Sequence, residues 1–137
     1  MMPNELDLRG TRVLIVDDSK TIRRSAETLL TKAGCEVQLA EDGFEALGKV
    51  VSFKPDLVFV DIMMPRLDGY HTCALIKNNP QFKDTPVVML SSKDGLFDRA
   101  KGRLVGAQLY LSKPFTADEL IGAVRASLAK ASSGESP

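Results

Sequence analysis

Short apolar runs recur along the chain, separated by longer stretches with the spacing of amphipathic helices. The five runs that we interpret as strands are Val13–Val16, Glu36–Ala40, Leu57–Val60, Val87–Leu90 and Leu109–Leu111. The runs at 13–16, 57–60 and 87–90 are apolar at every position, which is typical of parallel strands covered on both faces. The run at 36–40 alternates polar and apolar residues, so we expect that strand at an edge of the sheet.

Helix signals fill the stretches between these strands. One apolar stripe with helical spacing consists of Ile22, Ala26, Leu29, Leu30 and Ala33 and ends at Gly34. A capping residue stands three positions before a glutamate at Asp42 and at Thr116, which predicts a helix start at each point. The pattern therefore predicts five helices alternating with five strands.

Strands that alternate with helices in this way favour a doubly wound α/β sheet. Five strands fit the flavodoxin-like (βα)5 fold with strand order 2-1-3-4-5. The 137 residues correspond to about one domain, which we expect over residues 11–129. Residues 1–10 and 130–137 are expected to be flexible termini.

Composition narrows the class of protein. Eighteen basic residues balance eighteen acidic ones, so we expect neither nucleic acid nor an anionic membrane as a partner. No apolar run approaches the roughly 20 residues that span a bilayer. The two cysteines, Cys35 and Cys73, lie far apart, and no leader precedes the first strand, which favours a reducing cytoplasm. We expect a cytoplasmic monomer.

Carboxylates follow the first and third predicted strands. Asp17 and Asp18 come directly after the first strand, and Asp61 comes directly after the third. In this fold the functional site lies at the carboxyl ends of these two strands. Two unit charges about 4 Å apart repel by roughly 4 kcal/mol at an effective dielectric near 20, so a cluster of three needs a cation or protons. Oxygen ligands favour Mg²⁺ over Zn²⁺.

A hydroxyl and an ammonium are expected at the same edge of the sheet. Ser91 ends the fourth strand, and Lys113 follows the fifth. Taken singly, each of these residues is typical of a helix cap, a turn or a solvated surface. Together they suit a phosphoryl site, in which Asp61 is the nucleophile and the metal, Lys113 and Ser91 neutralise or bind the phosphoryl oxygens.

These residues resemble a known family, the receiver domains of two-component response regulators. The resemblance covers about residues 11–129 and is most similar to the stand-alone receivers of chemotaxis-like systems, among them regulators of twitching motility driven by type IV pili. The positions that carry it are Asp17, Asp18, the run DIMMPRLDG at 61–69, Ser91, Tyr110 and the pair Lys113-Pro114.

The resemblance implies a phosphorylation switch. A histidine kinase would transfer a phosphoryl group to Asp61, with Mg²⁺, or Mn²⁺ as a substitute, bound by Asp18, by Asp17 through water, by Asp61 and by the Met63 backbone carbonyl. Lys113 would pair with the phosphoryl group, and the Lys113-Pro114 bond would be cis. Movement of Ser91 and Tyr110 would then change the surface formed by the fourth helix, fifth strand and fifth helix, and so control a downstream effector protein.

The resemblance also bears on how long the phosphoryl group persists. In the family, the residues two positions after the acceptor and two after the hydroxyl control dephosphorylation, and these are Met63 and Lys93 here. Because Met cannot orient an attacking water and Lys could screen the phosphate, we expect slow dephosphorylation.

Three other readings compete. A phosphorylation-independent binding module would keep the fold but would not need the five site residues, which are Asp17, Asp18, Asp61, Ser91 and Lys113. An aspartate-nucleophile phosphatase usually has a second acid two residues after its nucleophile, where this chain has Met63. A nucleotide-binding protein is disfavoured because neither G-x-G-x-x-G nor the P-loop motif occurs. We therefore expect a phosphoacceptor signalling protein rather than an enzyme.

Overall fold

A five-stranded parallel sheet forms the centre of the protein. The computed structural model describes residues 8–92 and 96–133, and its strands are β1 (Arg12–Val16), β2 (Glu36–Ala40), β3 (Leu57–Asp61), β4 (Val87–Ser91) and β5 (Leu109–Ser112). They lie in the order β2-β1-β3-β4-β5 and all pair in parallel. The predicted fold and strand order are confirmed, and β2 is at an edge as expected.

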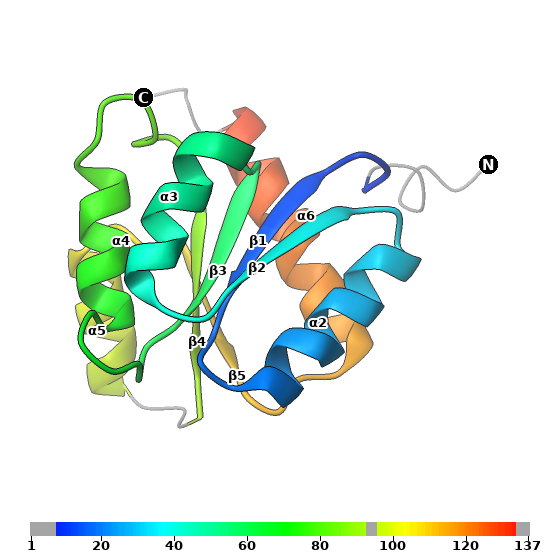
Figure 1. The fold of residues 1–137 in the computed structure, drawn as a ribbon. Coiled ribbons are helices and arrows are strands. Elements are labelled where there is room, and N and C mark those ends of the chain that lie inside the picture. The colour runs from blue at the N-terminus through cyan, green and yellow to red at the C-terminus, as the bar shows by residue number, and fades with distance from the viewer. Residues whose placement is uncertain (1–7, 93–95, 134–137) are drawn as a thin grey trace.

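Helices cover both faces of this sheet. Within the described residues they are α2 (Lys20–Lys32), α3 (Gly43–Phe53), α4 (Gly69–Lys77), α5 (Leu96–Leu104) and α6 (Ala117–Ser133). Figure 1 shows α2 and α6 on one face of the sheet and α3, α4 and α5 on the other. The predicted alternation of five strands with five helices is therefore confirmed.

Each central strand contributes side chains to two separate cores. In β1, Val13 and Ile15 pack in the core under α2 and α6, whereas Leu14 and Val16 pack in the core under α3 and α4. All four side chains are completely buried. Since burying one such side chain contributes about 1.5–3 kcal/mol, the apolar runs stabilise strands that are covered on both faces.

Helix caps lie at the carboxyl edge of the sheet, where they orient three helix N-termini toward one region. Ser19, Asp42 and Asp68 cap α2, α3 and α4, and each side chain accepts the N–H of the residue three positions later. The predicted capping box of α6 is also present: Thr116 and Glu119 exchange side chain to backbone bonds of 2.9 and 3.1 Å. The N-terminal ends of α2, α3 and α4 therefore favour negative charge near this edge.

Both ends of the folded region differ from the expected boundaries. Leu8 is buried in the core, and the Gly10 N–H donates to the carbonyl of Gly34 at 2.9 Å, so packing begins before residue 11. Leu6 and Leu8 alternate with charged residues over too few positions to predict an element, which is why the sequence did not reveal it. Helix α6 continues to Ser133, past residue 129. Residues 1–7 and 134–137 lie outside the described residues.

Two further features are a cis peptide bond next to the site and the character of the helices. The Lys113-Pro114 peptide bond is cis, as the resemblance implied. Among the residues that the structure describes, no helix has the length and apolarity that a membrane span requires.

Candidate functional site

Three carboxylates meet where β1 and β3 end. Val16 pairs with Val60 across these neighbouring strands, so the aspartates that follow them come together at the sheet edge. Asp17, Asp18 and Asp61 each offer an oxygen within 4.8 Å of the others. Asp17 and Asp61 are buried, with exposures of 0% and 4%, whereas Asp18 is exposed. The predicted convergence of the three side chains is confirmed.

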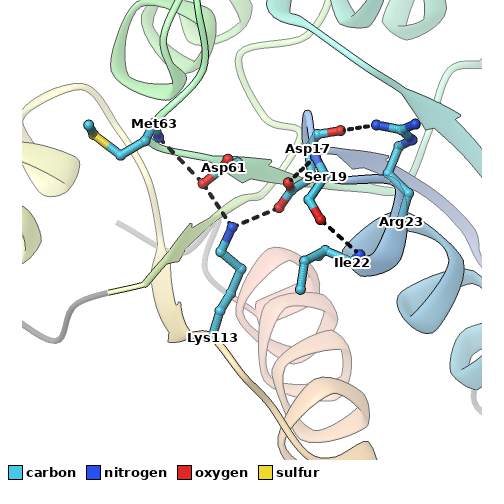
Figure 2. Close-up of polar contacts among 7 residues, drawn as sticks. All are labelled: Asp17, Ser19, Ile22, Arg23, Asp61, Met63 and Lys113. Carbon is cyan, nitrogen blue, oxygen red and sulfur yellow. Dashed lines mark hydrogen bonds and ion pairs between the residues drawn. The ribbon is translucent and has the colours of Figure 1, made fainter.

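Lys113 supplies a cation to this cluster from the end of β5. Its Nζ lies 3.0 Å from Asp17 Oδ2 and 3.2 Å from Asp61 Oδ1, and its side chain is only 14% exposed. Figure 2 shows the ammonium lying between the two carboxylates and bonded to both. Lys113 thus contacts two aspartates that are distant in sequence: Asp61 is 52 positions away and Asp17 is 96 positions away.

Negative charge exceeds positive charge among these buried groups. Burial, followed by the charge of Asp17, raises the pKa of Asp61 from 3.8 to about 6, although Lys113 and the Met63 N–H oppose the change. Burial disfavours the charged form of Lys113, but its hydrogen bonds and ion pairs with Asp17 and Asp61 outweigh this effect and raise its pKa. One ammonium therefore does not fully compensate two buried carboxylates.

The donor set fits a hard divalent cation. The three aspartates offer carboxylate oxygens, which Mg²⁺ prefers, and the cluster contains no histidine or cysteine for a softer metal. Asp17 Oδ1 already accepts the Ser19 N–H at 2.8 Å, and its Oδ2 accepts Lys113. Asp17 is thus more fully hydrogen-bonded within the protein than exposed Asp18, and a second cation would compensate the remaining negative charge.

The other predicted site residues lie around this cluster at different depths. Ser91 ends β4 beside β3 and is 5% exposed. The Met63 N–H donates to Asp61 Oδ1 over a long 3.4 Å, while its side chain is 74% exposed and points away from Asp61 in Figure 2. Tyr110 of β5 is half-buried and lines a separate cavity of about 320 Å³ together with Met89 and Gln108.

One residue that contacts the cluster was missed by the sequence analysis. Arg23, in the first turn of α2, donates from Nη1 to the main-chain carbonyl of Asp17 at 2.6 Å (Figure 2). It fixes the chain between β1 and α2 without touching a carboxylate. No local pattern marks this contact, because an arginine in a first helical turn is ordinarily a surface residue.

Comparisons with known proteins agree with this geometry. Residues 13–125 match the family model described as the response regulator receiver domain. The chain is 67% identical over 117 residues to Protein PilG of Pseudomonas aeruginosa. This alignment covers 85% of this chain and 87% of that protein. It is 40% identical over 126 residues to Response regulator MprA of a Mycobacterium species, covering 92% of this chain but 54% of MprA.

A solved structure gives the same result at the level of the fold. The chemotaxis protein CheY4 of Vibrio cholerae superposes with a TM-score of 0.84 at 34% identity, covering 87% of this chain and 99% of that one. The family match extends over most of the sheet and all three clustered aspartates. The chain therefore belongs to the response regulator receiver domain family.

Proposed function

We propose that the protein is a phosphorylation-activated switch whose phosphoacceptor is Asp61. The observation that carries this proposal is the buried pair of carboxylates, Asp17 and Asp61, sharing the single ammonium of Lys113. Such a site is short of positive charge and lies where a parallel α/β sheet binds ligands. A histidine kinase would supply the phosphoryl group, as the family membership implies.

In the proposed transfer, an Asp61 carboxylate oxygen bonds to phosphorus as the bond to the donor's imidazole nitrogen breaks. Lys113 neutralises an oxygen of the transferred group, which its present distance of 3.2 Å from Asp61 Oδ1 allows. The Ser91 hydroxyl donates to another oxygen. Asp18, Asp61, the Met63 carbonyl and, through water, Asp17 would hold Mg²⁺, which would supply electrostatic stabilisation.

The output of the switch is proposed to be the surface formed by α5, β5 and α6. Phosphorylation would draw Ser91 toward the phosphoryl group and let Tyr110 move inward, which stabilises one of two arrangements of this surface. The cavity that Tyr110 lines supports this reading, since it leaves space next to the side chain. A downstream effector protein would bind the phosphorylated arrangement.

We place the protein in a chemotaxis-like pathway, with motility as the controlled process. The support is the 67% identity to PilG and the structural similarity to a chemotaxis protein, CheY4. The balanced charge favours partners that are proteins rather than nucleic acid. We propose that the protein acts as a monomer in the cytoplasm.

The phosphorylated form is proposed to be long-lived. Met63, two residues after the acceptor, has an exposed apolar side chain that cannot hydrogen-bond an attacking water. Lys93, the second residue of this expectation, lies outside the described residues. Decay of the phosphoprotein within seconds would contradict this part of the proposal, and intact mass followed over time would measure it.

The test of the proposed function is intact mass after incubation with a small acyl-phosphate donor, with and without Mg²⁺. We expect one added phosphoryl group in the wild type and none in Asp61→Asn or without metal. Asp56→Asn, an exposed aspartate just before the same strand, is the matched control and should be phosphorylated normally. No adduct in the wild type would favour the phosphorylation-independent binding module, and turnover of a phosphomonoester that depends on Asp61 would favour the phosphatase.

A further inference from the structure

Arg66 lies in the loop that joins β3 to α4, five residues after Asp61. Its φ angle is +69°, in the left-handed region that residues other than glycine rarely occupy. A backbone in this conformation persists where surrounding contacts hold it. Contacts of the Arg66 side chain are therefore expected to hold this conformation.

The Arg66 side chain leaves its own loop and binds the start of α3. Its Nη2 lies 2.9 Å from Asp42 Oδ2, and its guanidinium carbon lies 5.9 Å from the centre of the Phe44 ring. The other carboxylate oxygen of Asp42 caps α3 by accepting the Glu45 N–H at 2.8 Å. Asp42 thus connects the loop to a helix end that is itself fixed.

Residues that follow Arg66 in the loop are closely packed. A Cβ added to Gly43 would lie 2.7 Å from Leu67 Cδ2, so the loop rests directly on the first turn of α3. At the far end, the Gly69 N–H donates to the Ile62 carbonyl at 3.0 Å, and a Cβ at Gly69 would overlap the Asp61 carbonyl oxygen. The loop is held at its end and at its middle.

In the first part of the same loop, Ile62 and Met64 are buried, and Met63 between them makes the weakest contacts. Met63 is attached to the site by one long hydrogen bond of 3.4 Å, and its side chain is largely exposed. Yet the Met63 carbonyl is the main-chain oxygen assigned to the metal under the proposed function. The position of that carbonyl therefore depends on buried Ile62 and Met64 and on contacts further along the loop.

We infer that Arg66 is a positioning residue for the metal site: through Asp42 it holds the loop so that the Met63 carbonyl faces the carboxylates. This inference rests on the proposed function. The Arg66 and Asp42 side chains are 66% and 22% exposed, and exposed ion pairs contribute little to global stability. The contact should therefore affect metal affinity more than folding.

The signs of the charges separate positioning from simple electrostatics. Arg66→Ala removes a positive charge, which by Coulomb's law alone would strengthen Mg²⁺ binding. Asp42→Asn removes a negative charge, which alone would weaken it, and Asn preserves the helix cap. If the two residues act by holding the loop, both substitutions weaken Mg²⁺ binding. The double variant then binds Mg²⁺ with the same affinity as the single variant that binds it less tightly.

The experiment is titration of the unphosphorylated protein with Mg²⁺ alone, followed by calorimetry or by backbone amide shifts. We expect the dissociation constant to rise about twofold to fivefold in Arg66→Ala, in Asp42→Asn and in the double variant, with the thermal midpoint within about 3 °C of wild type. Lys49→Ala is the matched control, because it removes an ion pair with Glu45 on the same helix and a hydrogen bond to the Leu39 carbonyl but no contact with the loop. Its dissociation constant should not rise.

Three results would overturn the inference. An unchanged or lower dissociation constant in Arg66→Ala with an intact fold would show that the loop needs no such contact. A rise in Lys49→Ala equal to that in Arg66→Ala would make the effect general to α3. Wild-type protein that neither binds Mg²⁺ nor becomes phosphorylated would remove the proposed function as well, whereas normal wild-type behaviour with unaffected variants overturns this inference alone.

Discussion

Charged residues lie at both ends of β1 and β3, but they are accessible to solvent at the amino ends, whereas two of them are buried at the carboxyl ends. At the amino ends, the Arg12 N–H donates to Asp56 Oδ2 at 2.8 Å, and the Arg12 guanidinium donates to the Lys54 carbonyl at 3.0 and 3.2 Å. Solvent reaches these groups. At the carboxyl ends, Asp17 and Asp61 are buried and share Lys113.

This difference distinguishes a structural arrangement from a functional one. Charges that remain in contact with water hold the strands at little cost in desolvation. Burial, and after it the charge of Asp17, raises the pKa of Asp61 to about 6, so the fold disfavours the charged form of this carboxylate. A chain under selection for stability alone would not need that imbalance, so it is the carboxyl edge that points to an incoming cation and phosphoryl group.

The largest expected effect is that of removing the shared cation. Lys113→Met keeps the apolar stem but leaves Asp17 and Asp61 without a positive partner, and we expect a loss of about 3 kcal/mol in the free energy of unfolding at pH 7. Arg12→Met, at the opposite end of β1, should cost about 1 kcal/mol or less. Urea denaturation of both variants measures the difference, and equal losses would remove the distinction between the two ends.

The second effect depends on pH. Because the folded protein holds the Asp61 proton more tightly than the unfolded chain, the contribution of Asp61 to the free energy of unfolding of the metal-free protein falls as pH rises from about 4 to about 6. Asp61→Asn lacks this dependence and should be more stable than wild type by up to about 3 kcal/mol at pH 7, since one pKa unit corresponds to about 1.4 kcal/mol. The advantage should vanish near pH 4.

Urea denaturation without Mg²⁺ at several pH values checks this prediction. Asp56→Asn is the matched control, because its carboxylate is exposed at the opposite edge. A stability difference between Asp61→Asn and wild type that does not change with pH would show that the metal-free fold does not disfavour the charged form of Asp61.

The third effect concerns the hydroxyl at the buried edge. Ser91→Ala should slow phosphorylation by the acyl-phosphate donor about tenfold, since a hydrogen bond to a charged group contributes about 1.5–3 kcal/mol. The neighbouring Ser92 is exposed, so Ser92→Ala should leave the rate unchanged. The rate of mass increase measures both variants, and an equal effect at the two positions would exclude a specific role for Ser91.

The smallest effect is expected at the exposed edge. Asp56→Ala removes the acceptor of the Arg12 N–H, which water can replace, so we expect a loss of about 1 kcal/mol or less. Phosphorylation and Mg²⁺ affinity should match those of wild type. A measurable loss of either in this variant would mean that the amino edge also contributes to the site.

Sequence patterns predicted those parts of the molecule that depend on local order. Strands such as β1 and β3 are apolar at nearly every position, so their type and their parallel pairing followed from composition and alternation. The convergence of Asp17, Asp18 and Asp61 followed from topology, since the carboxyl ends of neighbouring parallel strands meet at one edge.

Contacts that depend on side-chain direction could not be predicted in this way. Asp17 and Asp18 are adjacent in sequence, yet one is fully buried and the other exposed, and nothing in the pattern distinguishes them. Arg66 and Asp42 are 24 residues apart, and their ion pair depends on a left-handed residue that no glycine marks. Such contacts depend on the final placement of loops rather than on periodicity.

The most direct test of the charge imbalance is calorimetric titration with Mg²⁺ of wild type, Asp61→Asn and Asp56→Asn under identical conditions. We predict one binding site in wild type and in Asp56→Asn, and binding at least about tenfold weaker in Asp61→Asn, because a buried carboxylate ligand has been lost. Equal Mg²⁺ affinity in all three proteins would contradict the account, since the buried aspartates would then not form the metal site.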